Sequence, residues 1–160
     1  MAAQRGTYTV VFDQQTIAAA SGDYDLWELV PADDRPIELV ALLIGNKSEV
    51  GDAQDEMLAL SIVSDNTTGS NGTATTPRPL DPRDGAAGFT AETVGSTIAT
   101  GGTVITLLCD TFNVRSGYPL TLPEIMRPKV DQADTAMYVR LTAAVADDLT
   151  LSGTAWVREL

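Results

Sequence analysis

The sequence contains no histidine and a single cysteine among its 160 residues. Histidine is the most common general base and metal ligand near neutral pH, so Ser-His-Asp and Cys-His catalytic arrangements cannot be built from this chain. Zinc sites made of cysteine and histidine are excluded for the same reason. Neither GxxxxGK[ST] nor a GxGxxG motif after a strand occurs. These absences predict a protein that is not an enzyme, with no catalytic residues and no cofactor.

Basic residues are also scarce. Ten Lys and Arg stand against 22 Asp and Glu, which gives a formal net charge of −12. Binding to nucleic acid or to an anionic membrane surface needs clustered positive charge, and no apolar run approaches the ~18 residues of a membrane helix. The first residues, MAAQRGTYTV, lack the apolar segment of a secretory signal. We therefore expect folding in the cytoplasm, with neither nucleic acid nor membrane as a partner.

The single cysteine, Cys109, has no partner for an intramolecular disulfide. It lies in the apolar run VITLLC, where a free thiol usually behaves as a small buried hydrophobe. Among the carboxylates, Asp52, Asp55 and Glu56 form a weak candidate calcium site through their oxygen atoms. Their spacing does not match an EF-hand loop, so a solvated acidic turn is the more common interpretation.

Short apolar segments bounded by Gly, Pro and Asp dominate the chain, and no stretch longer than ten residues carries a helical apolar period. This pattern predicts an all-β fold: one domain over residues 1–160, built as a jelly-roll-like or related β-sandwich. Residues 7–15 would form the first strand or an N-terminal arm. The segments 37–44, 57–63 and 104–109 are apolar nearly throughout, which favours strands buried on both faces. Residues 149–157 alternate most regularly, and Gly153 within them predicts a bulge or a close approach.

Residues 64–88 stand out because they contain only one large apolar side chain, Leu80. They read SDNTTGSNGTATTPRPLDPRDGAAG. Structureless loops of this length are uncommon in compact domains and are often functional, so we predict a long polar loop or arm inserted in the β-domain. Its charges nearly cancel, and its prolines favour an extended chain. The candidate partner-binding residues are Arg5, Arg78, Pro79, Leu80, Asp81 and Arg83.

Several pieces of the chain, in consistent order, resemble a family of small proteins encoded in the head-gene clusters of tailed phages and prophages. The pieces are DLWELVPADDRPIELVALLIG (25–45), GDAQDEML (51–58), PRPLDPRDGAAG (77–88), FNVRSGYP (112–119), PEIMRP (123–128) and LTLSGTAWVREL (149–160). Members of this family are thought to be capsid decoration, or cement, proteins.

The resemblance implies a structural virion protein that binds the outer surface of a phage capsid and stabilises contacts between major capsid protein subunits, often as a homotrimer. A capsid exterior never meets packaged DNA, so a net charge of −12 is compatible with that location. Two alternatives stay open. One is a carbohydrate- or receptor-binding β-sandwich of a tail fibre, and the other is a tail-tube or head–tail joining component.

Overall fold

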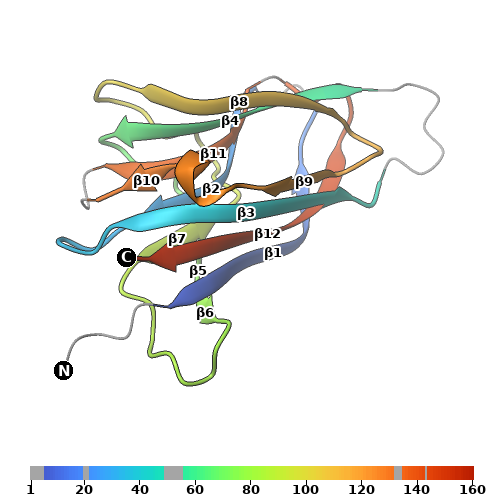
Figure 1. Ribbon diagram of the computed structural model, residues 1–160. Helices are drawn as coiled ribbons and strands as arrows, with labels where there is room; N and C mark the ends of the chain where they lie inside the picture. The colour runs from blue at the N-terminus through green and yellow to red at the C-terminus, as the bar shows by residue number, and fades with distance from the viewer. Residues whose placement is uncertain (1–5, 20–21, 49–55, 132–134, 143) are drawn as a thin grey trace.

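Two antiparallel sheets pack face to face in the computed structural model, which describes residues 6–19, 22–48, 56–131, 135–142 and 144–160 (Figure 1). Sheet A contains, in spatial order, β10 (Lys129–Val130), β3 (Ile37–Asn46), β12 (Leu149–Glu159), β1 (Thr7–Ile17) and β6 (Arg78–Pro79), and β9 (Tyr118–Thr121) also pairs with β3. Sheet B contains β5 (Thr73–Thr75), β7 (Thr90–Thr93), β2 (Tyr24–Val30), β11 (Ala136–Leu141), β4 (Met57–Asn66) and β8 (Ile105–Asn113). The described residues include one 3-10 helix, η1 (Glu124–Met126), and no α-helix. The predicted all-β sandwich is confirmed.

The core lies between the sheets because each strand turns alternate side chains inward. In β12, Leu149, Leu151, Ala155 and Val157 are buried, whereas the residues between them are half-buried on the other side. Trp27 reaches across from β2 toward sheet A, and its indole N–H donates to the carbonyl of Val10, 3.1 Å away. A Cβ atom at Gly153 would lie 2.5 Å from the Trp27 ring. The predicted close approach at Gly153 is therefore confirmed, and its cause is the Trp27 ring.

The segment 64–88, predicted as a long polar loop or arm, also contains short stretches that are paired with the sheets. Residues 64–66 end β4, β5 pairs with β7 in sheet B, and β6 pairs with Tyr8 and Thr9 of β1 in sheet A. The Leu80 N–H then donates to the Thr7 carbonyl at 2.8 Å. Strands of two or three residues carry no measurable period, so the sequence pattern could not reveal them. The segment links the two sheets along one side of the sandwich (Figure 1).

The segment 104–109 corrects a second prediction. It was expected to be a strand buried on both faces, but β8 is the outermost strand of sheet B and has a neighbour, β4, on one side only. Ile105 and Leu107 are exposed, and so is Cys109, so the prediction of a buried thiol is wrong. Apolar content shows that a segment can form a strand, but the position of the strand in the sheet depends on contacts made far along the chain.

Candidate interaction surface

The outer face of sheet A carries two cross-strand rows of uncharged side chains. Strand register places the rows side by side across β1, β12, β3 and β9, and the inward neighbours Val10, Ala155 and Leu42 are buried in the core. One row contains Val11, Thr154, Leu43 and Pro119, and the other contains Thr9, Trp156, Ala41 and Thr121. We call the apolar members of these rows, Val11, Ala41, Leu43, Pro119 and Trp156, the sheet A face.

The sheet A face is open to solvent. Val11 and Leu43 are each 48% exposed, and Trp156 is half-buried. Two shallow depressions, of about 510 and 380 Å³, lie on either side of Leu43 and share it in their linings. Single exposed apolar residues are normal, but contiguous ones mark an interaction site. The sheet A face is therefore the strongest candidate for a binding surface among the described residues.

A buried carboxylate anchors the segment that borders one end of this face. Glu38 is fully buried, and its carboxylate forms ion pairs with Arg127 and Arg158, each at 2.7 Å, and with Lys129 at 3.5 Å. Arg158 lies two residues from Trp156 on the same side of β12 and also bonds Glu124 of η1, at 3.0 Å. That bond and the Arg158 charge lower the pKa of Glu124. Ion pairs thus hold η1 at the end of the sheet A face.

The helix held in this way displays two large apolar side chains. Ile125 is 95% exposed and Met126 is 66% exposed. Side chains of this type are rarely left fully in water without a binding role when they adjoin other apolar surface. Ile125 and Met126 are thus two further exposed apolar side chains, on the helix whose Glu124 bonds Arg158.

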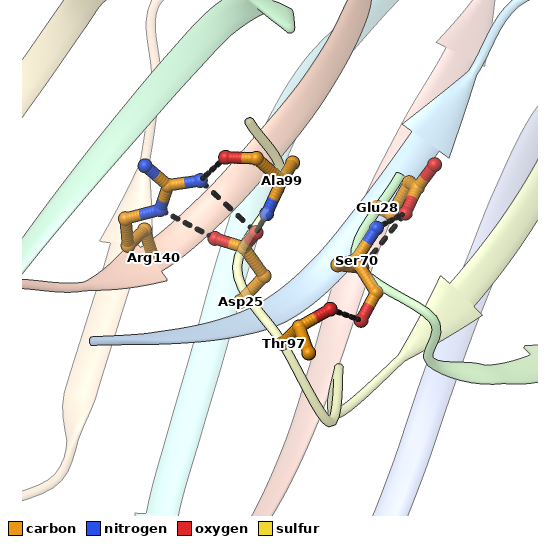
Figure 2. A network of polar contacts seen from close by, with 6 residues as sticks. All are labelled: Asp25, Glu28, Ser70, Thr97, Ala99 and Arg140. Carbon is orange, nitrogen blue, oxygen red and sulfur yellow. Dashed lines mark hydrogen bonds and ion pairs between the residues drawn. The ribbon is translucent and has the colours of Figure 1, made fainter. Parts of the chain in front are cut away.

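The outer face of sheet B is covered over its central strands β2 and β11. Two loops cover it, and a buried ion pair holds one of them (Figure 2). The Arg140 guanidinium donates to both oxygens of Asp25, at 2.6 and 3.0 Å, and to the carbonyl of Ala99 at 3.0 Å. The Ala99 N–H donates back to Asp25 at 2.6 Å. Because Asp25 and Arg140 are both buried, this network locks the loop around Ala99 onto the sheet.

The second loop is held by Glu28. Its carboxylate accepts from the N–H and from the hydroxyl of Ser70, both at 2.7 Å. The Thr97 hydroxyl donates to the Ser70 carbonyl at 3.3 Å, which ties the two loops together (Figure 2). Beneath them lies a small apolar cluster of Val63, Ala99, Ala136 and Tyr138, with Val30 packed against it. The part of sheet B beneath these loops is therefore not available to a partner, whereas Met57 of β4 and Cys109 of β8 remain exposed.

The sequence-predicted binding segment borders the sheet A face. Arg78 lines a polar depression of about 370 Å³ together with Thr9 and Val11. Pro79 pairs with Tyr8, and Leu80 is 56% exposed. Asp81 and Arg83 form an exposed ion pair with each other at 2.6 Å, and hydrogen bonds from Arg83 lower the pKa of Asp81. The segment and the sheet A face meet at Val11.

The remaining sequence-based candidates are the partner-binding residue Arg5 and the weak calcium site of Asp52, Asp55 and Glu56. Arg5, Asp52 and Asp55 lie outside the described residues. The third member of the candidate calcium site, Glu56, accepts a hydrogen bond from the Ala146 N–H at 2.7 Å. Within the part of the chain that the structure describes, no three His, Cys, Asp or Glu side chains are grouped so that they could hold a metal ion.

Sequence reasoning missed the sheet A face. Leu43 belongs to the apolar run 37–44, which was expected to be buried on both faces, and Trp156 belongs to the alternating segment 149–157, for which no exposed binding face was predicted. In an antiparallel sheet one face commonly meets water, and its strands then alternate apolar and polar residues. An apolar residue at an outward position is therefore a usable signal, but only once the inward face is known.

Comparison of the chain with protein-family models, with curated proteins and with solved structures gives no match. No helix in the described ranges has the length and apolar character needed to span a bilayer.

Proposed function

We propose that this protein is a non-enzymatic structural component of a phage virion. It binds the outer surface of the capsid and stabilises contacts between major capsid protein subunits. The observation that carries the proposal is the uncovered sheet A face, a contiguous apolar surface on an otherwise strongly acidic chain. The resemblance of the chain to capsid decoration proteins supplies the identity of the partner.

The geometry suits binding to a large rigid object. The sheet A face is built on four hydrogen-bonded strands, so its side chains are held in place before a partner arrives. A preorganised surface loses less conformational entropy on binding than a flexible loop does. An oligomer of this chain would make several such contacts with the shell at once and would gain avidity from them.

Charge supports the same arrangement. The two rows of the sheet A face contain no charged residue, although the chain as a whole has a formal net charge of −12. Interface cores are depleted of charged residues and enriched in aromatic ones. Trp156 at the centre of the apolar rows fits that composition.

The test uses purified capsids that lack this protein. The wild-type chain should bind them at a fixed ratio to the major capsid protein and raise the temperature at which they open. Leu43→Lys and Val11→Lys should weaken binding by about tenfold or more, because a desolvated unpaired charge costs over ~1.4 kcal/mol. Both side chains are about half exposed, so the folded monomer should tolerate either change.

Leu80→Lys is the matched control, since Leu80 is exposed to a similar degree in the segment 64–88. Normal binding by this variant, with loss in Leu43→Lys, assigns the contact to the sheet A face. Loss in Leu80→Lys alone would assign it to the segment instead. Absence of binding by the wild-type chain would overturn the proposal.

The carbohydrate-binding alternative finds one supporting residue, because Trp156 is partly exposed beside a depression. Sugar sites combine such a platform with precisely placed polar groups. Here the neighbours lining the depression are Val40, Ala41, Leu42, Leu43, Pro119, Leu120 and Thr121. Because only one of these side chains carries a hydroxyl, we rank carbohydrate binding below capsid binding. Binding to a glycan array that is abolished in Trp156→Ala would reverse this ranking.

A further inference from the structure

Along the strands of sheet A, the outer face changes character beside the row that contains Val11 and Leu43. The next outward positions of β1, β12 and β3 are Asp13, Ser152 and Gly45. Ser152 pairs with Gly45 in the strand register, and its hydroxyl donates to the Asp13 carboxylate at 2.7 Å. The outer face therefore steps down from large apolar side chains to a carboxylate, a hydroxyl and a position without a side chain.

This step forms the larger of the two depressions beside Leu43, with a volume of about 510 Å³. Val11 and Leu43 line it from one row, and Asp13, Ser152 and Gly45 line it from the next. A Cβ atom at Gly45 would have no neighbour within 4 Å, so the missing side chain leaves open space. Pockets of ~300–1,000 Å³ accommodate small ligands, and this one has room for a single long side chain of a partner.

Asp13 is the one charged residue among the described residues that line the depression. Hydrogen bonds from the Ser152 hydroxyl and then from the Gln14 side chain lower the pKa of Asp13, so its carboxylate is ionised at neutral pH. The charge of Lys47 also acts on Asp13, but the Lys47 ammonium bonds the side-chain oxygen of Gln14. No Lys or Arg within the described ranges forms an ion pair with Asp13. An exposed carboxylate without an ion-pair partner thus borders an apolar depression.

We propose that the depression receives a lysine or arginine side chain of the capsid surface. The carbon stem of this side chain lies over Thr154, between Val11 and Leu43, and its charged end pairs with Asp13. Long basic side chains bury their stems along apolar surface and keep the charge in a polar environment. Successive outward positions along a strand are about 6.6 Å apart, a span that the four-carbon stem of lysine covers. This assignment rests on the proposed function, since it names the chemistry that the same surface recognises on its partner.

A long basic side chain suits both parts of the depression, whereas other side chains suit one part or neither. An acidic side chain would be repelled by Asp13 and by a chain whose net charge is −12. An apolar side chain would cover Val11 and Leu43 but would strip water from Asp13 without supplying a partner, which is costly for a charge. The same net charge disfavours a second copy of this acidic chain. A basic group on the capsid covers the apolar row and pairs the carboxylate.

Purified capsids that lack this protein test the contact through Gly45→Met and Asp13→Asn. Gly45 does not have a positive φ, so its backbone accepts methionine, whose side chain enters the open space. Capsid binding should weaken about tenfold or more, because the partner's side chain is excluded from its place. Asp13→Asn keeps an oxygen for the Ser152 hydroxyl but removes the charge. Its binding should weaken about fivefold and should depend less on salt concentration.

Asp33→Asn is the matched control. Asp33 is also exposed, but it lies in the turn before β3, at the opposite end of that strand from Gly45. The substitution changes the net charge as Asp13→Asn does, and this variant should bind capsids like the wild type. Normal binding by both Gly45→Met and Asp13→Asn would overturn the proposal while leaving capsid binding itself in place. Equal losses in the two asparagine variants would overturn it too, because net charge rather than a contact at Asp13 would then be responsible.

A titration of the free protein separates this contact from the proposed function. The probes are Nα-acetyl-lysine amide and its uncharged analogue Nα-acetyl-norleucine amide, and backbone-amide NMR follows them at millimolar concentration. The lysine probe should shift the signals of Gly45 and Ser152 more than the norleucine probe does, and Asp13→Asn should abolish the difference. Equal responses to the two probes in the wild type would overturn the proposal. If the wild type failed to bind capsids, the proposed function would fall, and the titration would still decide whether the depression takes a basic side chain.

Discussion

The outer faces of sheets B and A differ in which side chains they bury. Both depart from the usual arrangement, in which charged side chains are exposed and large apolar ones are buried. On sheet B, two loops bury Asp25, Glu28 and Arg140 against the strands. On sheet A, Val11 and Leu43 stay about half exposed, and no loop among the described residues covers them. Charged side chains are buried around Asp25 and Arg140, and large apolar side chains are exposed around Leu43.

The difference shows which face serves the fold. Burying a charge is costly unless its partner and its remaining hydrogen bonds are all in place, and the Asp25–Arg140–Ala99 network meets that condition. Such a network defines one position for each loop. The sheet A face makes no comparable internal contact, so its exposed apolar side chains gain most from a partner outside the chain.

The largest effect should follow from breaking the buried ion pair. Arg140→Met leaves Asp25 buried without its cation, and the free energy of unfolding should fall by about 3–5 kcal/mol. Urea denaturation measures the loss. Asp25→Leu combined with Arg140→Met should recover much of it, because the double variant leaves no unpaired charge. A loss below ~1 kcal/mol in the single variant would mean that the network does not hold the covered face.

Removal of the second loop anchor should have a smaller effect. Glu28→Ala takes the acceptor away from the Ser70 N–H and hydroxyl, and a cost of about 1–3 kcal/mol is expected for polar groups left unsatisfied. Amide exchange at Ser70 should accelerate. The control is Glu124→Ala, whose exposed ion pair with Arg158 is worth under ~1 kcal/mol. Equal losses in both variants would contradict the assigned role of Glu28.

Alkaline pH should lower the stability of the fold, partly through Tyr138, which belongs to the apolar cluster on the covered side of sheet B. Burial, followed by the charges of Glu28 and Asp25, raises the pKa of Tyr138 above its ordinary value of 10.0. Above that value the unfolded chain loses the Tyr138 proton while the folded chain keeps it, so stability falls as pH rises.

Denaturation from pH 9 upward checks this expectation, and Tyr138→Phe should flatten the decline. Tyr118→Phe is the companion variant, because burial and the Asp110 bond raise the pKa of Tyr118 to about 12. The loss of stability caused by Tyr118 should occur only between pH 10.0, its ordinary pKa, and pH about 12. If stability fell with pH equally steeply in both variants, the alkaline loss of stability would have to come from other groups.

The smallest effect is expected on the bare face. Leu43→Ser should change the free energy of unfolding by less than ~1 kcal/mol, because Leu43 is already half in water. Urea denaturation, as for Arg140→Met, measures this change, so the losses of the two variants can be compared directly. A loss above ~2 kcal/mol would mean that Leu43 packs within the chain and that the two faces differ less than the structure indicates.

Much of the sandwich could be predicted from local pattern. The alternation from Leu149 to Val157 identifies β12 and its inward side, and Gly153 already indicated a close approach. The predicted segment 57–63 lies within β4. These features follow from the alternation of residues two positions apart or from a short apolar run, so they can be recognised in the sequence without the structure.

The candidate site was predicted only in part. Arg78 and Leu80 were singled out, and they border the sheet A face near Val11. Leu43 and Trp156 were not singled out. The run that contains Leu43 is apolar at nearly every position, so the pattern does not show which side chains face outward. The segment that contains Trp156 alternates, but nothing in it marks the outward side as exposed. Whether an outward residue is covered depends on which loop folds over it, and that loop comes from a distant part of the chain.

The amino-acid sequence alone determined the all-β class, the strand-forming segments and the absence of histidine chemistry, since these follow from residue type and from periodicity over a few positions. The tertiary structure decided that β8 lies at an edge, that residues 64–88 link the two sheets, and that one outer face is covered while the other is bare. The physical reason is that strand order and loop coverage depend on contacts between residues far apart in the chain, such as Asp25 with Arg140 and Glu28 with Ser70.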